Sequence, residues 1–251
     1  MYIPRMTRLL TCLFALLIPL SAAAADKMTK ETFDSGGRTR TYYLLVPESA
    51  RKSPAPPMIV LLHGSGRDGL SLLDPWTRLA KKEGVVLVAP DSLTPAGWRV
   101  PEDGPDFLHE LIEMLAFQLE VDKRRLYLFG HSAGAGHALM MALLESEYFA
   151  AVTAHAGVLP DSALPLLERA ARKTPIAMWV GTDDALFPVP VVRATRDALK
   201  AQGFATELTE MAGHTHRYYD RSSFINDRVW NFLRQYVLPA EPKYQRYQIV
   251  R

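Results

Sequence analysis

A serine between small residues stands near the middle of the chain, in the sequence Gly130-His131-Ser132-Ala133-Gly134. The spacing fits the G-x-S-x-G pattern, in which a sharp strand-to-helix turn lifts a serine hydroxyl above a sheet. Glycines two residues either side of Ser132 are expected there, because strand and helix backbones approach each other closely at such a turn. The pattern makes Ser132 a candidate nucleophile, and the amides that open the following helix would stabilise an oxyanion.

A serine hydroxyl is a poor nucleophile near neutral pH, so it needs a nearby base and a carboxylate that orients this base. Two later loops carry such groups in the order serine, acid, histidine that the pattern uses. Asp183 and Asp184 lie in the first loop, and His214 and His216 lie in the second. Spacing alone does not decide which aspartate is the acid or which histidine is the base. No sequence motif relates His155 to Ser132, so His155 is interpreted as structural.

The segments around these residues predict an alternation of buried strands and helices. The apolar run 125–129 precedes the serine turn as a strand, and the Ala-, Leu- and Met-rich residues after the turn favour helix. Further strands are expected at 58–62, 85–89, 149–155, 174–180 and 205–211, and helices at 72–82, 106–119, 163–172, 191–202 and 221–237. Two β runs within 30–46 flank a Gly-Gly turn and predict an antiparallel hairpin.

This order of elements predicts an α/β fold with a mostly parallel, twisted sheet and helices on both faces. The chemistry in such a fold lies at the carboxyl ends of the strands, where the serine, aspartate and histidine loops all begin. Pro90 to Gly104 is an irregular segment at another strand end, and it contains Trp98. Trp98 either forms an aromatic wall of a substrate pocket or packs beneath its own loop.

Length and composition favour one globular domain over residues 26–251. The chain has 251 residues, of which 48% are hydrophobic and 22% are charged, as in ordinary globular proteins. Residues 1–25 contain two of the 29 basic residues and none of the 27 acidic ones, so the remainder carries equal numbers of both. This balance offers no basis for a nucleic-acid or anionic-membrane partner.

The first 25 residues predict a cleaved secretory signal peptide. Arg5 and Arg8 precede an apolar run over 9–20, and Ala23-Ala24-Ala25 forms an A-x-A cleavage site before Asp26. The apolar run is shorter than the roughly twenty residues that span a bilayer, so no stable membrane insertion is expected after cleavage. We therefore expect the protein to be secreted or periplasmic. Cleavage also removes the only cysteine, and no Cys/His zinc spacing exists, so neither a disulfide nor a metal is expected.

The motifs resemble those of the α/β-hydrolase superfamily, and within it the esterases grouped with feruloyl esterases, polyhydroxybutyrate depolymerase-like proteins and S-formylglutathione hydrolase (esterase D). Leu61-Leu62-His63-Gly64 resembles the oxyanion loop of that group, which implies that the backbone amides of Ser65 and Ala133 hold an oxyanion. Gly181-Thr182-Asp183-Asp184 resembles its acid loop and selects Asp184. His216-Arg217-Tyr218-Tyr219 resembles its His-x-Tyr-Tyr stretch and selects His216, whereas alignment to the Gly-His loops of other members selects His214.

The resemblance implies a serine hydrolase that cleaves carboxylic esters through an acyl-enzyme intermediate, with Ser132, His216 and Asp184 as its catalytic residues and no cofactor. A serine peptidase or amidase with the same residues is one alternative, and a non-catalytic binding protein of the same fold is another. The substrate is expected to be a small-molecule or polymeric ester. A polymer is less favoured, because no accessory polymer-binding module is visible and residues 26–251 lack cysteine, unlike disulfide-bearing depolymerases. The sequence leaves acyl and alcohol specificity and oligomeric state open.

Overall fold

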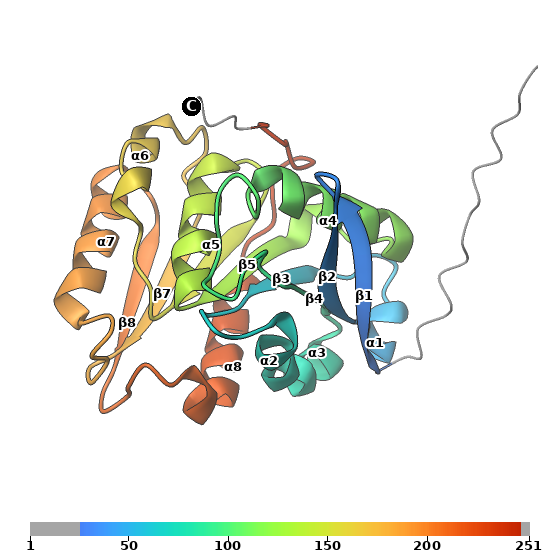
Figure 1. The fold of residues 1–251 in the computed structure, drawn as a ribbon, viewed down its shortest axis with the longest axis horizontal. Helices are drawn as coiled ribbons and strands as arrows, with labels where there is room; N and C mark the ends of the chain where they lie inside the picture. Colours follow the sequence, from blue (N-terminus) through green and yellow to red (C-terminus); the bar gives the residue numbers. More distant parts are fainter. Residues whose placement is uncertain (1–25, 247–251) are drawn as a thin grey trace, which may run out of the picture.

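The structure is a computed structural model that describes residues 26–246, so the expected signal peptide at 1–25 lies outside the described residues, as do 247–251. Its centre is one twisted eight-stranded sheet with helices on both faces (Figure 1). The strand order is β1-β2-β4-β3-β5-β6-β7-β8. The strands are β1 (Met28–Ser35), β2 (Arg38–Leu45), β3 (Met58–Leu62), β4 (Val86–Pro90), β5 (Leu126–His131), β6 (Ala151–His155), β7 (Ile176–Gly181) and β8 (Thr206–Met211). The predicted α/β fold is confirmed.

The pairing of the strands explains their composition. β3 to β8 are mutually parallel, and β1 and β2 form the predicted antiparallel hairpin at one edge. The hairpin turns at Gly36 and Gly37, whose φ values of 57° and 73° suit the mirror-image turns that match strand twist. Alternate residues of β3 enter opposite cores, since Val60 packs in one and Ile59 in the other. A strand covered on both faces therefore reads as a continuous apolar run.

Two groups of helices cover the two faces of the sheet (Figure 1). One face packs against α4 (Pro105–Leu119), α5 (Ala133–Leu144), α6 (Leu166–Arg169) and α7 (Val189–Ala201). The other face packs against α2 (Gly69–Leu73), α3 (Thr77–Glu83) and α8 (Ser222–Leu233). A single turn of helix, α1 (Glu48–Arg51), lies in the segment between β2 and β3. Among the described residues, no helix has the length and apolar character needed to cross a membrane.

Three predicted helices are shorter or more broken than expected. The helix expected at 163–172 was wrong: the chain forms a 3-10 turn at Asp161–Ala163 and then only α6, with Pro165 between them. Pro75 similarly divides the helix expected at 72–82 into α2, a 3-10 turn at Asp74–Trp76, and α3. Proline lacks an amide donor and disrupts a continuing helix, which explains both corrections. α8 ends at Leu233, four residues before the predicted end.

Candidate active site

Ser132 stands at the strained turn between β5 and α5. Its φ and ψ are 56° and −118°, a positive-φ conformation that non-glycine residues rarely adopt and that costs about 1–3 kcal/mol. Its amide donates a 2.9 Å hydrogen bond to the carbonyl oxygen of His155, which fixes the turn against β6. The turn leaves the hydroxyl at the carboxyl edge of the sheet, directly before the N-terminus of α5.

The glycines around Ser132 are required by close backbone contacts. A Cβ atom at Gly130 would lie 2.1 Å from the carbonyl oxygen of Gly134. A Cβ atom at Gly134 would lie 2.0 Å from the carbonyl oxygen of Leu62 in β3. Real Cβ atoms do not come this close to backbone, so any larger residue would push α5 away from the sheet. The expectation that this turn needs small residues on both sides of the serine is confirmed.

Three residues from three strand ends are linked by hydrogen bonds at this edge. His216, which follows β8, places Nε2 3.0 Å from Oγ of Ser132 and Nδ1 2.9 Å from Oδ2 of Asp184, which follows β7. The imidazole therefore lies between a hydroxyl and a carboxylate, as a base that is oriented by an acid must. Of the two candidate pairs, the structure brings Asp184 and His216 to Ser132, and it places Asp183 and His214 elsewhere.

The carboxylate of Asp184 is held in one orientation. Its side chain is fully buried, and Oδ1 accepts 2.9 Å hydrogen bonds from the amides of Leu186 and Phe187. The other oxygen is thus directed at the His216 ring. The Phe187 ring stacks on that imidazole with centroids 5.6 Å apart and an interplanar angle of 21°, which restrains rotation of the ring. Both contacts preorganise the histidine without a large rearrangement.

Asp183 and His214 shape the loops that carry the other pair. The Asp183 side chain is exposed and accepts a hydrogen bond from the neighbouring Thr182 hydroxyl, while its amide donates to the carbonyl oxygen of His214. A Cβ atom at Gly181 would lie 1.8 Å from that same carbonyl oxygen, so the two loops pass in direct contact. His214 itself is buried and points its ring toward β6.

A chain of buried imidazoles lies behind the site. Nδ1 of His131 is 3.0 Å from Nδ1 of His155, and Nε2 of His155 is 3.2 Å from Nε2 of His214. Burial lowers the pKa of His131 to about 3 and lowers the pKa values of His155 and His214 as well. These rings therefore stay neutral near neutral pH, and His131 adds no charge beside the His216 ring, whose centroid is 5.1 Å away.

No sequence motif marks this imidazole chain as a unit. One signal was present: His131 and His155 end two neighbouring parallel strands and are paired in register. Side chains at paired positions on adjacent strands lie on the same face, so two histidines there are expected to touch.

The two proposed oxyanion donors lie on either side of the serine. Ser65 follows β3 and Ala133 is the first residue of α5, and neither amide has a hydrogen-bond acceptor within residues 26–246. Gly97 bridges them, since a Cβ atom there would be 3.3 Å from both the Ala133 Cβ and the Ser65 Oγ. Unpaired amides beside a candidate nucleophile are the donors that a developing oxyanion requires.

Trp98 supports the segment that carries Ser65. Its indole nitrogen donates a 2.8 Å hydrogen bond to the carbonyl oxygen of His63, and its ring packs on His63 and His137. It also lines an apolar cavity of about 350 Å³ together with Met140 and Leu166. The cavity that contains Ser132 is a different one, of about 590 Å³. Its lining residues are Gly64, Ser65, Arg67, His131, Ser132, His216, Arg217 and Tyr219.

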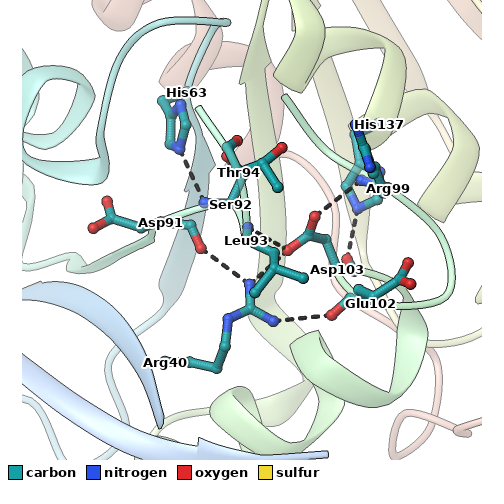
Figure 2. Close-up of polar contacts among 10 residues, drawn as sticks. All are labelled: Arg40, His63, Asp91, Ser92, Leu93, Thr94, Arg99, Glu102, Asp103 and His137. Atoms are coloured by element: carbon teal, nitrogen blue, oxygen red, sulfur yellow. Dashed lines mark hydrogen bonds and ion pairs between the residues drawn. The ribbon is translucent and has the colours of Figure 1, made fainter. Parts of the chain in front are cut away.

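The loop that contains Trp98 is anchored by a buried ion pair (Figure 2). The Arg40 guanidinium of β2 donates to Oδ1 of Asp103 at 2.5 Å, and the two side chains are 5% and 0% exposed. The same carboxylate accepts hydrogen bonds from the amides of Leu93 and Arg99, and the Asp103 carbonyl oxygen contacts Nε2 of His137 in α5. One carboxylate thus joins the edge hairpin to both ends of the loop that covers Ser65 and Ala133.

An Asp103→Asn substitution is expected to lower the free energy of unfolding by about 3–5 kcal/mol, because it leaves the buried Arg40 guanidinium without a counter-ion. Urea denaturation of the variant and the wild type measures this change. The matched control is Asp227→Asn, which breaks an ion pair of similar length, 2.6 Å, whose side chains are about half exposed. That control is expected to cost less than about 1 kcal/mol. Equal losses in the two variants would contradict the assigned role of Asp103.

The described residues hold no group of three histidine, cysteine or carboxylate side chains placed to bind a metal ion. A serine, an oriented histidine, a carboxylate and unpaired backbone amides are the groups that acyl transfer uses.

Comparisons with known proteins agree with this architecture. A model of the alpha/beta hydrolase family matches residues 59–248. A candidate esterase, NocK, from Nocardia uniformis subsp. tsuyamanensis is 30% identical over 164 residues, which are 61% of this chain and 47% of that protein. The chain thus spans about half the length of this relative.

Solved structures share the fold at lower sequence identity. An S-formylglutathione hydrolase from Agrobacterium tumefaciens has a TM-score of 0.65 and 20% identity, with 82% of this chain and 94% of that chain covered. The poly(3-hydroxybutyrate) depolymerase LpqC from Bordetella parapertussis has a TM-score of 0.65 and 18% identity, with 82% and 91% covered. At these identities the likeness concerns the fold.

Proposed function

The chain belongs to the alpha/beta hydrolase family, and from that membership we propose that this esterase-like hydrolase cleaves carboxylic esters with Ser132 as its nucleophile. The observation that carries the proposal is the position of His216, with one ring nitrogen 3.0 Å from the Ser132 hydroxyl and the other 2.9 Å from Asp184. Ester cleavage by acyl transfer needs a nucleophile, an oriented base and an oxyanion site, and each has a named counterpart here.

The proposed reaction has two halves. Oγ of Ser132 attacks the ester carbonyl carbon while Nε2 of His216 takes the hydroxyl proton, and the amides of Ser65 and Ala133 stabilise the oxyanion. The imidazolium then gives this proton to the departing alcohol, which leaves an acyl group on Ser132. A water molecule, deprotonated by His216, hydrolyses that acyl group and restores the hydroxyl. Asp184 stabilises the imidazolium and keeps Nε2 directed at Ser132.

The test uses purified residues 26–251 with 4-nitrophenyl esters of increasing acyl length, methyl ferulate and a short peptide amide. Ester turnover well above the rate of the amide is expected, together with labelling of Ser132 by a fluorophosphonate. Turnover of the amide alone would favour a peptidase or amidase with the same residues. A folded protein that turns over neither substrate and resists the label would contradict the proposal and favour a binding function.

The proposal extends to location and substrate size. The composition of residues 1–25 supports export and cleavage after Ala25, so N-terminal sequencing of protein from the periplasm or medium is expected to begin at Asp26. An uncleaved N-terminus on the exported protein would contradict this. The 590 Å³ cavity is of the size that holds small-molecule ligands, which favours small-molecule esters over polymers.

A further inference from the structure

Two arginines line the cavity that contains Ser132. Arg67 belongs to the segment between β3 and α2, two residues beyond Ser65, and Arg217 directly follows His216. Both arginines line the cavity, and no aspartate or glutamate of the described chain does. A cleft whose wall holds cations without carboxylates attracts anions and concentrates them near the reacting atoms.

The Arg67 guanidinium is oriented but not neutralised. Its central carbon lies 5.0 Å from the centroid of the Tyr219 ring, a cation–π contact. No carboxylate within residues 26–246 forms an ion pair with it. A cation–π contact occupies none of the guanidinium N–H groups, and the fork that these groups form matches the two oxygens of a carboxylate.

A second arginine lines the same cavity. Arg217 forms an ion pair of 3.0 Å with Asp220, but the side chains are 77% and 52% exposed. Such an exposed pair is weak, so its cation remains available to a ligand.

We propose that the preferred substrate is an ester that carries a carboxylate, and that Arg67 binds this carboxylate while the ester carbonyl lies at Ser132. Arg217 adds a second attractive charge on the His216 side of the cavity. The inference rests on the proposed esterase function and specifies its substrate class. Because both arginines line the same cavity as Ser132, the carboxylate belongs either to the acyl part or to the alcohol part.

Two substrate pairs test this preference at low salt. The first pair is 4-nitrophenyl hemiglutarate and 4-nitrophenyl valerate, which share acyl length and leaving group. The second pair is 4-acetoxybenzoate and 4-acetoxybenzamide, which place the charge in the alcohol part. The anionic member of at least one pair is expected to have a kcat/KM about 10-fold higher, since one charge-assisted hydrogen bond contributes roughly that factor. The ratio is expected to fall as ionic strength rises.

An Arg67→Gln substitution is expected to lower that anionic-to-neutral ratio about 10-fold. The matched control is Arg228→Gln, since the Arg228 guanidinium also stacks on an aromatic ring, 4.3 Å from the centroid of Phe224, but does not line the cavity. The control is expected to keep the wild-type ratio. A wild type that favours the neutral ester in both pairs would overturn the proposal, as would an equal loss in both variants or no loss in Arg67→Gln.

A binding measurement separates this inference from the esterase proposal. Calorimetric titration of the Ser132→Ala variant with 4-nitrophenyl hemiglutarate, 4-acetoxybenzoate and their neutral counterparts requires no turnover. Tighter binding of the anion in at least one pair, lost when Arg67→Gln is added, supports the inference even if the wild type hydrolyses no ester. Equal binding within both pairs by a protein that does hydrolyse esters would overturn the inference and leave the esterase proposal standing.

Discussion

A Ser132→Ala variant is expected to lose ester turnover by a factor of about 10⁴ to 10⁶ in kcat while it stays folded. Removing Oγ deletes the atom that forms the acyl-enzyme bond in the proposed reaction, and the proposed oxyanion amides are expected to retain only a small acceleration over water. Folding is expected to survive, because the substitution keeps a Cβ atom and adds no volume at the strained turn. The measurement is steady-state hydrolysis of a 4-nitrophenyl ester, with circular dichroism to check the fold.

Ser223→Ala serves as the matched control for that experiment. Ser223 is an exposed residue of α8 and does not line the cavity with Ser132, so full activity is expected. Undiminished turnover in the Ser132→Ala variant would show that Ser132 is not the nucleophile. Equal losses in both serine variants would show that the assay does not report on this site.

Alanine substitutions at His216 and His214 are expected to lower kcat by amounts that differ by orders of magnitude. His216→Ala removes the ring that lies 3.0 Å from the Ser132 hydroxyl, and a loss of about 10⁴-fold or more in kcat is expected. His214→Ala removes a buried ring whose side-chain partner is His155, so its main effect is expected on stability. Turnover per folded molecule, from active-site titration with a fluorophosphonate in wild type and His214→Ala, separates the two effects.

The reverse pattern would move the base to the other histidine. A loss of several orders of magnitude in His214→Ala, with near-normal turnover in His216→Ala, contradicts the assignment. Similar large losses in both variants, with both proteins folded, would mean that the position of His216 depends on the imidazole chain behind it.

The sequence was most informative where local chemistry decides the structure. Ser132 and its flanking glycines predicted a strand, a tight turn and a helix, because only small residues fit where the Gly130 and Gly134 backbones meet their neighbours. The parallel sheet followed from apolar runs that are buried on both faces. Loop geometry was less predictable: Asp183 and Asp184 are adjacent and chemically alike, so their spacing does not distinguish them. The resemblance selected Asp184, and the structure directs the Asp184 side chain at His216.

Long-range polar contacts were not predictable from this single sequence. Arg40 and Asp103 are 63 positions apart, and no local pattern pairs a hairpin arginine with a loop aspartate. The position of Trp98, beside the oxyanion segment but outside the Ser132 cavity, depends on the same loop. The helix expected at 163–172 was wrong for a local reason, since Pro165 lies among its apolar residues and interrupts the helix.

The ion pair of Arg40 with Asp103 couples the edge strands of the sheet to the candidate active site. Arg40 belongs to the antiparallel edge of the sheet, whereas Leu93 and Arg99, held by the same carboxylate, belong to the loop against the oxyanion amides. Local opening usually starts at such margins and spreads through shared contacts. We therefore expect that fraying of the hairpin on heating also releases this loop, so that turnover is lost in the same transition.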